Sequence, residues 1–98
     1  MTIEKRLENG CLTFAVGGRL DTNTAPELEA ELELDGASEV VFDFTGLEYI
    51  SSAGLRVLMT AHKTMAAAGG AVKVLHPNAM VRGVFEMTGL CDIFTVAE

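Results

Sequence analysis

The sequence predicts a single α/β domain in which helices pack against a mixed β-sheet. Three observations predict this class: a hairpin signal at 9–10, a β-branched and aromatic run over 40–44, and helical segments that alternate with further strands. The order reads β-β-α-β-α-β-α, with two strand–helix–strand crossovers. The 98 residues, 49% of them hydrophobic, suffice for one core and leave no room for a second. We therefore expect one domain over residues 1–98.

The N-terminal segment predicts an antiparallel hairpin. Apolar residues occupy every second position over 3–7 and 12–16, and the Asn-Gly pair at 9–10 favours a tight turn between two such strands. We expect the Gly-Gly pair at 17–18 to end the second strand.

The next segment predicts an acidic amphipathic helix that begins at Thr24. Thr24 and Glu27 have the spacing of a capping box, and Pro26 falls in the first turn, where proline is tolerated. We expect this helix to end near the Asp-Gly pair at 35–36.

The middle of the chain predicts the central strand and a long helix. Residues 40–44 have the pattern of a strand that is covered on both faces, as in parallel sheets. A loop is expected over 45–50. A helix should then run from Ala53 to about Ala68 and end at the following Gly-Gly pair.

The C-terminal third predicts one more strand and one more helix. The strand should cover 72–75 and stop at the His-Pro pair at 76–77. Asn78 is a good N-cap for the helix, and Gly89 should end it. We expect residues 93–94 either to form a brief terminal strand or to pack on the core.

The composition excludes several classes of function. Seven basic and fourteen acidic residues give a net charge of −7, which opposes binding to nucleic acid and to anionic lipid. No apolar run approaches the roughly 20 residues of a membrane-spanning helix, and the N-terminus lacks a signal-peptide pattern, so we expect a cytoplasmic protein. Cys11 and Cys91 have no metal-binding or redox spacing, so we expect inert thiols, no metal and no cofactor.

The Ser-Ser pair at 51–52 is the strongest local signal for a site. The chain has no nucleotide-binding glycine loop and no nucleophile elbow. Ser52 can be interpreted as the N-cap of the following helix, which spacing alone favours, or as a phosphate acceptor whose charge would meet the positive helix end. Arg56 falls four residues later on the same helical face, where it could pair with the phosphate or reach a partner.

Four segments, each weak alone, occur together in a specific order and spacing. They are Gly18-Arg19-Leu20-Asp21, Val41-Phe42-Asp43-Phe44, Ile50-Ser51-Ser52-Ala53-Gly54-Leu55 and Val84-Phe85-Glu86-Met87-Thr88-Gly89-Leu90. With these segments the chain resembles the STAS domain family and, within it, the bacterial anti-sigma factor antagonists. The resemblance covers nearly the whole chain and implies the STAS fold.

The resemblance implies a switch and not an enzyme. In that family the unphosphorylated antagonist binds an anti-sigma factor that is also an ATP-dependent serine kinase, and so frees the sigma factor. Phosphorylation breaks this complex, and a metal-dependent serine phosphatase restores the binding form. The family's acceptor motif, Asp-Ser-Ser/Thr-Gly, places the acceptor at Ser52, with Ser51 as second choice. This sequence has Ser51 at the position of the motif's Asp and Ala53 at that of its second hydroxyl residue.

The resemblance also implies a contact surface for the anti-sigma factor kinase. It comprises the turn at 21–23, the serine pair and the exposed side of the following helix, with Asp21 as the leading acidic candidate. The predicted contact residues are Asp21, Thr22, Asn23, Ser51, Ser52 and Arg56.

Two other classes of function stay open from the sequence. The absence of the motif's Asp favours a constitutive STAS adaptor or structural subunit of a transport, lipid-trafficking or signalling complex, without a phosphoswitch. A binder of a neutral or apolar small molecule, or an enzyme without a known motif, is the third alternative.

Overall fold

The computed structural model of the chain describes residues 1–97. These residues form a six-stranded sheet, three α-helices and one 3-10 turn, which confirms the predicted α/β class. The elements, in chain order, are β1 Thr2–Glu8, β2 Cys11–Leu20, α1 Ala25–Ala30, β3 Glu39–Asp43, β4 Leu47–Ile50, α2 Ser52–Ala67, β5 Ala71–Leu75, α3 Ala79–Thr88, η1 Leu90–Asp92 and β6 Thr95–Ala97.

The sheet is mixed, as predicted. Its strand order is β1-β2-β3-β5-β6, with only the β1–β2 hairpin antiparallel, and β3 is the central strand. β4 lies off this path and pairs in parallel with the last residues of β2. β2 therefore pairs with β1 and with β3 along its first part, and with β4 at its end.

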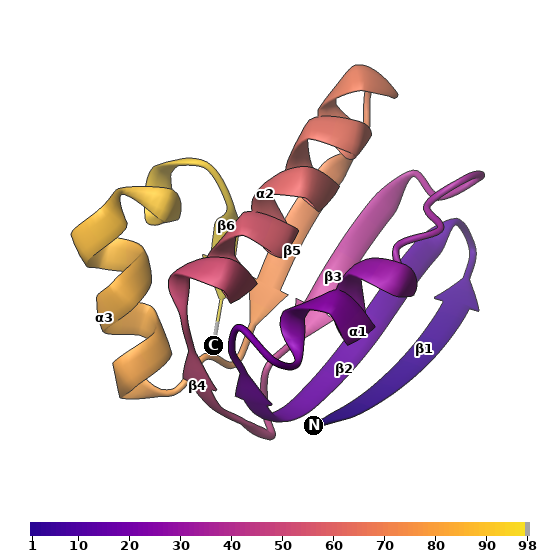
Figure 1. Cartoon of the computed structure of the whole chain (residues 1–98). Coiled ribbons are helices and arrows are strands. Elements are labelled where there is room, and N and C mark those ends of the chain that lie inside the picture. The colour runs from indigo at the N-terminus through magenta and orange to yellow at the C-terminus, as the bar shows by residue number, and fades with distance from the viewer. Residues whose placement is uncertain (98) are drawn as a thin grey trace.

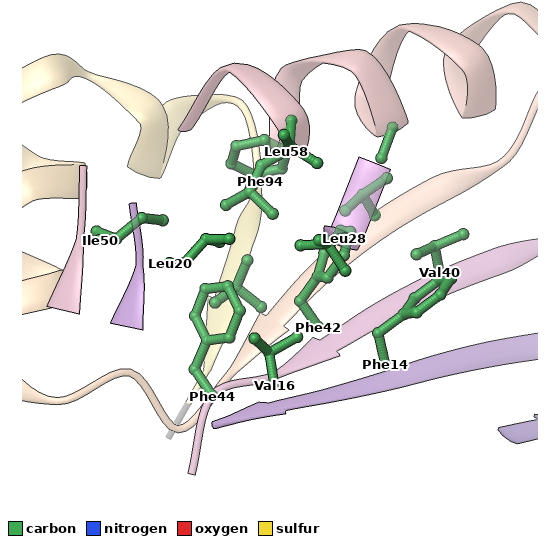
Figure 2. Packing of buried hydrophobic residues seen from close by; sticks show 14 of the residues in the cluster. Phe14, Val16, Leu20, Leu28, Val40, Phe42, Phe44, Ile50, Leu58 and Phe94 are labelled. Atoms are coloured by element: carbon green, nitrogen blue, oxygen red, sulfur yellow. The ribbon is translucent and has the colours of Figure 1, made fainter. Parts of the chain in front are cut away.

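The hydrophobic core lies between the sheet and the helices. α1 and α2 lie across one face of the sheet, and α3 stands beside β4 (Figure 1). Alternate residues of the strands point into this layer, so that Phe14, Phe42 and Phe44 are fully buried. Figure 2 shows these rings beneath α2, with Leu20 and Ile50 close to one another at the ends of β2 and β4.

The hairpin turn forms as predicted, but the second strand does not end at the glycines. Asn9 and Gly10 have φ values of 51° and 81°, the two positive values of a type I′ turn. β2 continues through 17–18 to Leu20, with a register shift between Gly18 and Arg19 where its pairing with β4 begins. The glycines thus mark a change of partner strand, because β4 supplies new backbone hydrogen bonds beyond them.

The first helix is shorter than predicted and ends at Ala30 rather than near 35–36. Leu28 is fully buried and Leu34 is 8% exposed. Six residues of helix rotate a side chain by about 240°, so a continuous helix could not bury both leucines against one sheet. The chain leaves the helix and Leu34 reaches the core from an irregular segment.

The predicted loop over 45–50 is wrong, because Leu47–Ile50 forms the strand β4. Leu47 and Ile50 are each 2% exposed, whereas Glu48 is exposed. Buried positions three apart do not give the alternation of a strand, and four residues are too few to establish any other repeat. The strand depends on its pairing with β2, which the local pattern does not reveal.

The predicted bounds of the remaining helices and strands agree with the structure to within about one residue. α2, β5 and α3 occupy the expected ranges, Asn78 accepts a hydrogen bond from the N–H of Val81 at 2.8 Å, and Gly89 ends α3 with φ 78°. Of the two alternatives at 93–94, Phe94 packs in the core, and the short strand β6 follows it. The His62 ring packs edge-on against Phe94 with 5.7 Å between centroids.

Candidate partner-binding and phosphorylation site

The pairing of β2 with β4 brings the predicted site residues together. Leu20 and Ile50 are register partners, and the N–H of Ser51 donates to the Leu20 carbonyl at 2.9 Å. The Asp21 turn and the serine pair therefore follow directly from the ends of two adjacent parallel strands. This edge of an α/β sheet is where binding sites concentrate.

Gly54 allows α2 to begin against these strand ends. A Cβ atom on Gly54 would lie 2.8 Å from Cγ of Leu20 and 2.9 Å from Cγ1 of Ile50, well inside van der Waals contact. It would also lie 2.9 Å from the Leu20 carbonyl oxygen. The glycine of the Ser-Ser-Ala-Gly segment is thus required by the close approach of helix and sheet, which fixes the position of the preceding serines.

The two serines have different surroundings. Ser51 is the N-cap of α2, and its partly buried hydroxyl accepts from the N–H of Gly54 at 3.5 Å, a long hydrogen bond. Ser52 is the first residue of the helix, is exposed, and makes no side-chain hydrogen bond to residues 1–97. The interpretation of Ser52 as the N-cap is therefore wrong, because α2 starts at Ser52, one residue earlier than that interpretation requires.

The Asp21 turn is held by a dense set of hydrogen bonds. The Asp21 carboxylate accepts from the N–H groups of Asn23 and Thr24, at 3.0 and 3.2 Å. The Thr24 hydroxyl donates to the Arg19 carbonyl at 2.7 Å and accepts from the Asp21 N–H at 2.9 Å. The capping box predicted for Thr24 does not form, since Thr24 makes no side-chain cap to α1 and its hydroxyl closes the preceding turn instead.

These contacts also determine the charge of the turn. Partial burial raises the pKa of the Asp21 carboxyl, but the hydrogen bonds from Thr24 and Asn23 lower it. The Arg19 guanidinium, whose Nε lies 3.7 Å from the carboxylate, lowers it further, and the net pKa is below the ordinary value. Arg19 in turn lies over the Tyr49 ring of β4, 4.2 Å from the centroid. The turn therefore presents an ionised carboxylate in a fixed position.

A groove of about 310 Å³ lies between α1 and α2, next to these residues. Thr22 and Arg56 both line it, so the structure places the predicted contact residues of the turn and of the helix around one depression. The Arg56 side chain is exposed and has no ion pair with any residue of 1–97. The full lining is Thr22, Ala25, Pro26, Glu29, Ala53, Arg56, Val57 and Thr60.

Sequence reasoning missed the contribution of Thr24, Tyr49 and the α1 side of the groove. The position of Thr24, three residues after Asp21, is typical of a hydroxyl that closes a turn, but the same position is equally typical of a helix cap. Nothing in the sequence indicated a role for Tyr49, because its contact with Arg19 depends on the unpredicted pairing of β4 with β2.

No cluster of three or more His, Cys, Asp or Glu side chains that could hold a metal ion occurs within residues 1–97. Over the same part of the chain, no helix is long and apolar enough to span a membrane.

Comparisons with known proteins agree with this architecture. The STAS domain family matches residues 2–98. BtrV of Bordetella bronchiseptica, named as an anti-sigma factor antagonist, is 39% identical over 93 residues, which cover 92% of this chain and 80% of BtrV. The chain therefore belongs to the STAS domain family. Within that family its sequence relatives are anti-sigma factor antagonists, as the segments at 18–21 and 50–55 indicated.

Solved structures with the same fold are close in shape and distant in sequence. The protein TM1081 from Thermotoga maritima superposes with a TM-score of 0.90 at 19% identity, over 98% of this chain and 86% of that one. The Bacillus cell fate determinant SpoIIAA, in its phosphorylated form, gives a TM-score of 0.78 at 18% identity, over 99% and 92%. At these identities the likeness establishes the fold.

Proposed function

We propose that this protein is an anti-sigma factor antagonist controlled by phosphorylation of Ser52. In its unphosphorylated form it binds an anti-sigma factor that is also a serine kinase, and phosphorylation releases it. A serine phosphatase regenerates the binding form, so the chain is a substrate and a binding module and not itself an enzyme. It acts in the cytoplasm, where sigma factors act.

The observation that carries the proposal is the exposed hydroxyl of Ser52, which forms no hydrogen bond within residues 1–97, at the first position of a 16-residue helix. A phosphoryl group there adds about −1.5 to −2 charges and meets the positive end of the helix, so the fold can accept it. Ser51 is a weaker acceptor because its hydroxyl is partly buried and caps the helix. SpoIIAA, which shares this fold, has been solved in a phosphorylated form, which supports the same chemistry here.

The surroundings of Ser52 explain how a phosphate could end binding. The Asp21 carboxylate and the groove bearing Arg56 lie on the same surface. A new dianion there would repel acidic partner groups and would lose its hydration against apolar ones, at a cost of several kcal/mol. Each 1.4 kcal/mol changes affinity tenfold, so such a cost separates a stable complex from a negligible one.

The direct test is phosphorylation by the cognate kinase with ATP, followed by intact-mass measurement and site mapping. We expect one added phosphate, on Ser52, that Ser52→Ala abolishes. Ser51→Ala is the matched control and should still be modified at Ser52. A phosphate on another residue, or none in the presence of an active kinase, contradicts the proposal.

A second candidate function is a constitutive adaptor without a phosphoswitch. The observation that favours it is Ser51 at the position where the family's motif has Asp, so that no acidic side chain adjoins Ser52 in sequence. Ser52→Asp distinguishes the two functions in a binding assay with the natural partner. A phosphoswitch predicts a loss of affinity of tenfold or more, whereas an adaptor predicts nearly unchanged affinity.

A further inference from the structure

The strand β1 presents an open edge of the sheet. Within residues 1–97 it pairs with β2 alone, and six of its seven residues are exposed. Leu7 is 61% exposed, which is unusual for a large aliphatic side chain in a strand. Open strand edges are templates for pairing with another strand, and natural proteins commonly prevent this with charged side chains, lysine above all, with proline or with bulges. β1 has no proline and no bulge, and its charged residues are of both signs, with Glu4 and Glu8 acidic and Lys5 and Arg6 basic, so opposite charges can face one another across a strand pair.

The type I′ turn determines which backbone groups of β1 face outward. In a two-residue turn the flanking residues, Glu8 and Cys11, exchange hydrogen bonds. Bonded and non-bonded pairs alternate along an antiparallel ladder, so the residues at 4 and 6 also bond to β2. The N–H and C=O groups of Ile3, Lys5 and Leu7 therefore point away from β2, toward the open edge.

We propose that two copies of this chain associate through β1, as antiparallel neighbours related by a twofold axis at Lys5. In this register the outward backbone groups of Lys5 meet those of its counterpart, and Ile3 of each copy faces Leu7 of the other. Glu4 faces Arg6 of the other copy in a non-bonded pair, the arrangement in which side chains approach most closely. The two sheets then form one continuous sheet.

The side chains of β1 fit this register in three ways. Each dimer contains two Glu4–Arg6 pairs of opposite charge, which stabilise cross-strand neighbours, and Arg6 also has a partner in its own chain, since its Nε lies 3.1 Å from Glu8 Oε1. Each Leu7 gains the aliphatic side chain of Ile3 as a neighbour on the helix side of the sheet. The like-charged Lys5 side chains turn back onto their own subunits, since Nζ lies 5.8 Å from the centroid of the Phe14 ring and donates to the Glu31 carbonyl at 3.3 Å.

The association is reversible and independent of the phosphorylation surface. A single pair of seven-residue strands buries an area at the low end of specific interfaces, so the dimer exchanges with monomer. None of the pairing groups belongs to the Asp21 turn or to the start of α2. A dimer therefore carries two Ser52 sites, whether or not the proposed phosphoswitch is correct.

Amide hydrogen exchange measured by NMR at increasing protein concentration tests the backbone register directly. We expect the amides of Ile3, Lys5 and Leu7 to become protected as concentration rises, while those of Glu4 and Arg6, already bonded to β2, change little. A monomer up to millimolar concentration, or protection confined to another surface, overturns the proposal.

Charge exchange tests the side-chain register by sedimentation velocity. Arg6→Glu and Glu4→Arg should each weaken dimerisation at least tenfold, because each places like charges opposite one another. The double variant restores opposite charges at both pairs and should recover most of the association. Single variants that dimerise normally, or a double variant no better than the singles, contradict this register. Circular dichroism and thermal unfolding of each variant identify any loss of the hairpin itself.

Discussion

The two parts of the candidate site differ sharply in how firmly they are held. The Asp21 turn is fixed by hydrogen bonds from two backbone N–H groups and by the Thr24 hydroxyl, and its carboxylate lies beside Arg19. The Ser52 hydroxyl, a short distance away across the β2–β4 pair, is exposed and unbonded within residues 1–97.

This difference suits a surface that is recognised and also modified. A recognition element benefits from a fixed geometry, because less conformational entropy is lost on binding. A phosphate acceptor needs the opposite, since its hydroxyl must enter a kinase active site without breaking contacts of its own. The packing of Leu20, Ile50 and Gly54 beneath both parts keeps them adjacent while leaving one of them free.

Truncating Leu20, which packs beneath both the Asp21 turn and the start of α2, should have the largest effect on stability. Leu20 is fully buried and ends the strand from which the Asp21 turn begins. Leu20→Ala should lower the free energy of unfolding by about 2–5 kcal/mol, through lost burial and a residual cavity. Chemical denaturation measures this. Met87→Ala, at a position 86% exposed, is the control and should change stability by less than about 0.5 kcal/mol. Similar effects in both variants would contradict the packing described.

A methyl group at the start of α2 should have the next largest effect. Gly54→Ala introduces a Cβ within 3 Å of Leu20 and Ile50, and we expect a loss of about 1–3 kcal/mol from overpacking. Gly83→Ala in α3 is the matched control, because, apart from its chain neighbours and the backbone of its own helix, no atom of residues 1–97 lies within 4 Å of its added Cβ. That variant should gain about 0.5–1 kcal/mol, the helix preference of alanine over glycine. A gain in both variants would show that the helix start is not tightly packed.

Thr24→Val probes the turn alone. It removes a hydroxyl that donates to the Arg19 carbonyl and accepts from the Asp21 N–H, and we expect a loss of about 1–2 kcal/mol. Thr22→Val makes the same chemical change at an exposed residue of the same turn and should cost less than about 0.5 kcal/mol. Equal costs would show that the Thr24 hydroxyl does not hold the turn.

The Asp21 carboxyl should titrate below its ordinary pKa of 3.8. Because its folded-state pKa is lowered, Asp21 stabilises the fold above the unfolded-state pKa, and this contribution is lost as pH falls through the folded-state value. NMR titration of the carboxyl carbons should show a higher Asp21 pKa in Thr24→Val. The pKa of Asp43, lowered by Thr45 against the effect of burial, should not change. A shift of both groups would indicate a general loss of structure.

Ser52→Ala should have the smallest effect on stability, within about 0.5 kcal/mol, because the hydroxyl has no hydrogen-bond partner to lose among the 97 described residues. Ser51→Ala removes the N-cap oxygen and should cost about 0.5–1 kcal/mol, at the low end for caps since the hydrogen bond is long. Thermal unfolding of the two variants side by side measures the contrast. A larger cost at Ser52 would mean that its hydroxyl is engaged.

Elements with a regular pattern could be predicted from the sequence, and elements defined by tertiary pairing could not. The hairpin, β3, α2, β5 and α3 follow from periodicity and from local signals such as Asn78 and Gly89. β4 could not be predicted, because its four residues become a strand only against the end of β2. α1 was overestimated because burial of Leu34 overrides the helical pattern.

The site shows the same division. The residues at 21–23, 51–52 and 56 could be chosen from the motifs, and the structure brings them to one surface. Which serine caps α2 could not be decided, because the helix boundary differs by a single residue between the two readings. The role of Thr24 was hidden because a threonine at that position can close the turn before a helix as easily as it can cap the helix.

The pairing of Leu20 with Ile50 also bears on when the site comes into existence. The Asp21 turn and Ser52 lie in separate stretches of sequence and become neighbours only once β2, β4 and α2 have come together. Closing such a long loop is among the later and slower events of folding, after the local hairpin. A kinase that contacts both stretches would therefore phosphorylate the folded chain and not unfolded copies. The presence of the phosphate would then indicate that the chain had folded.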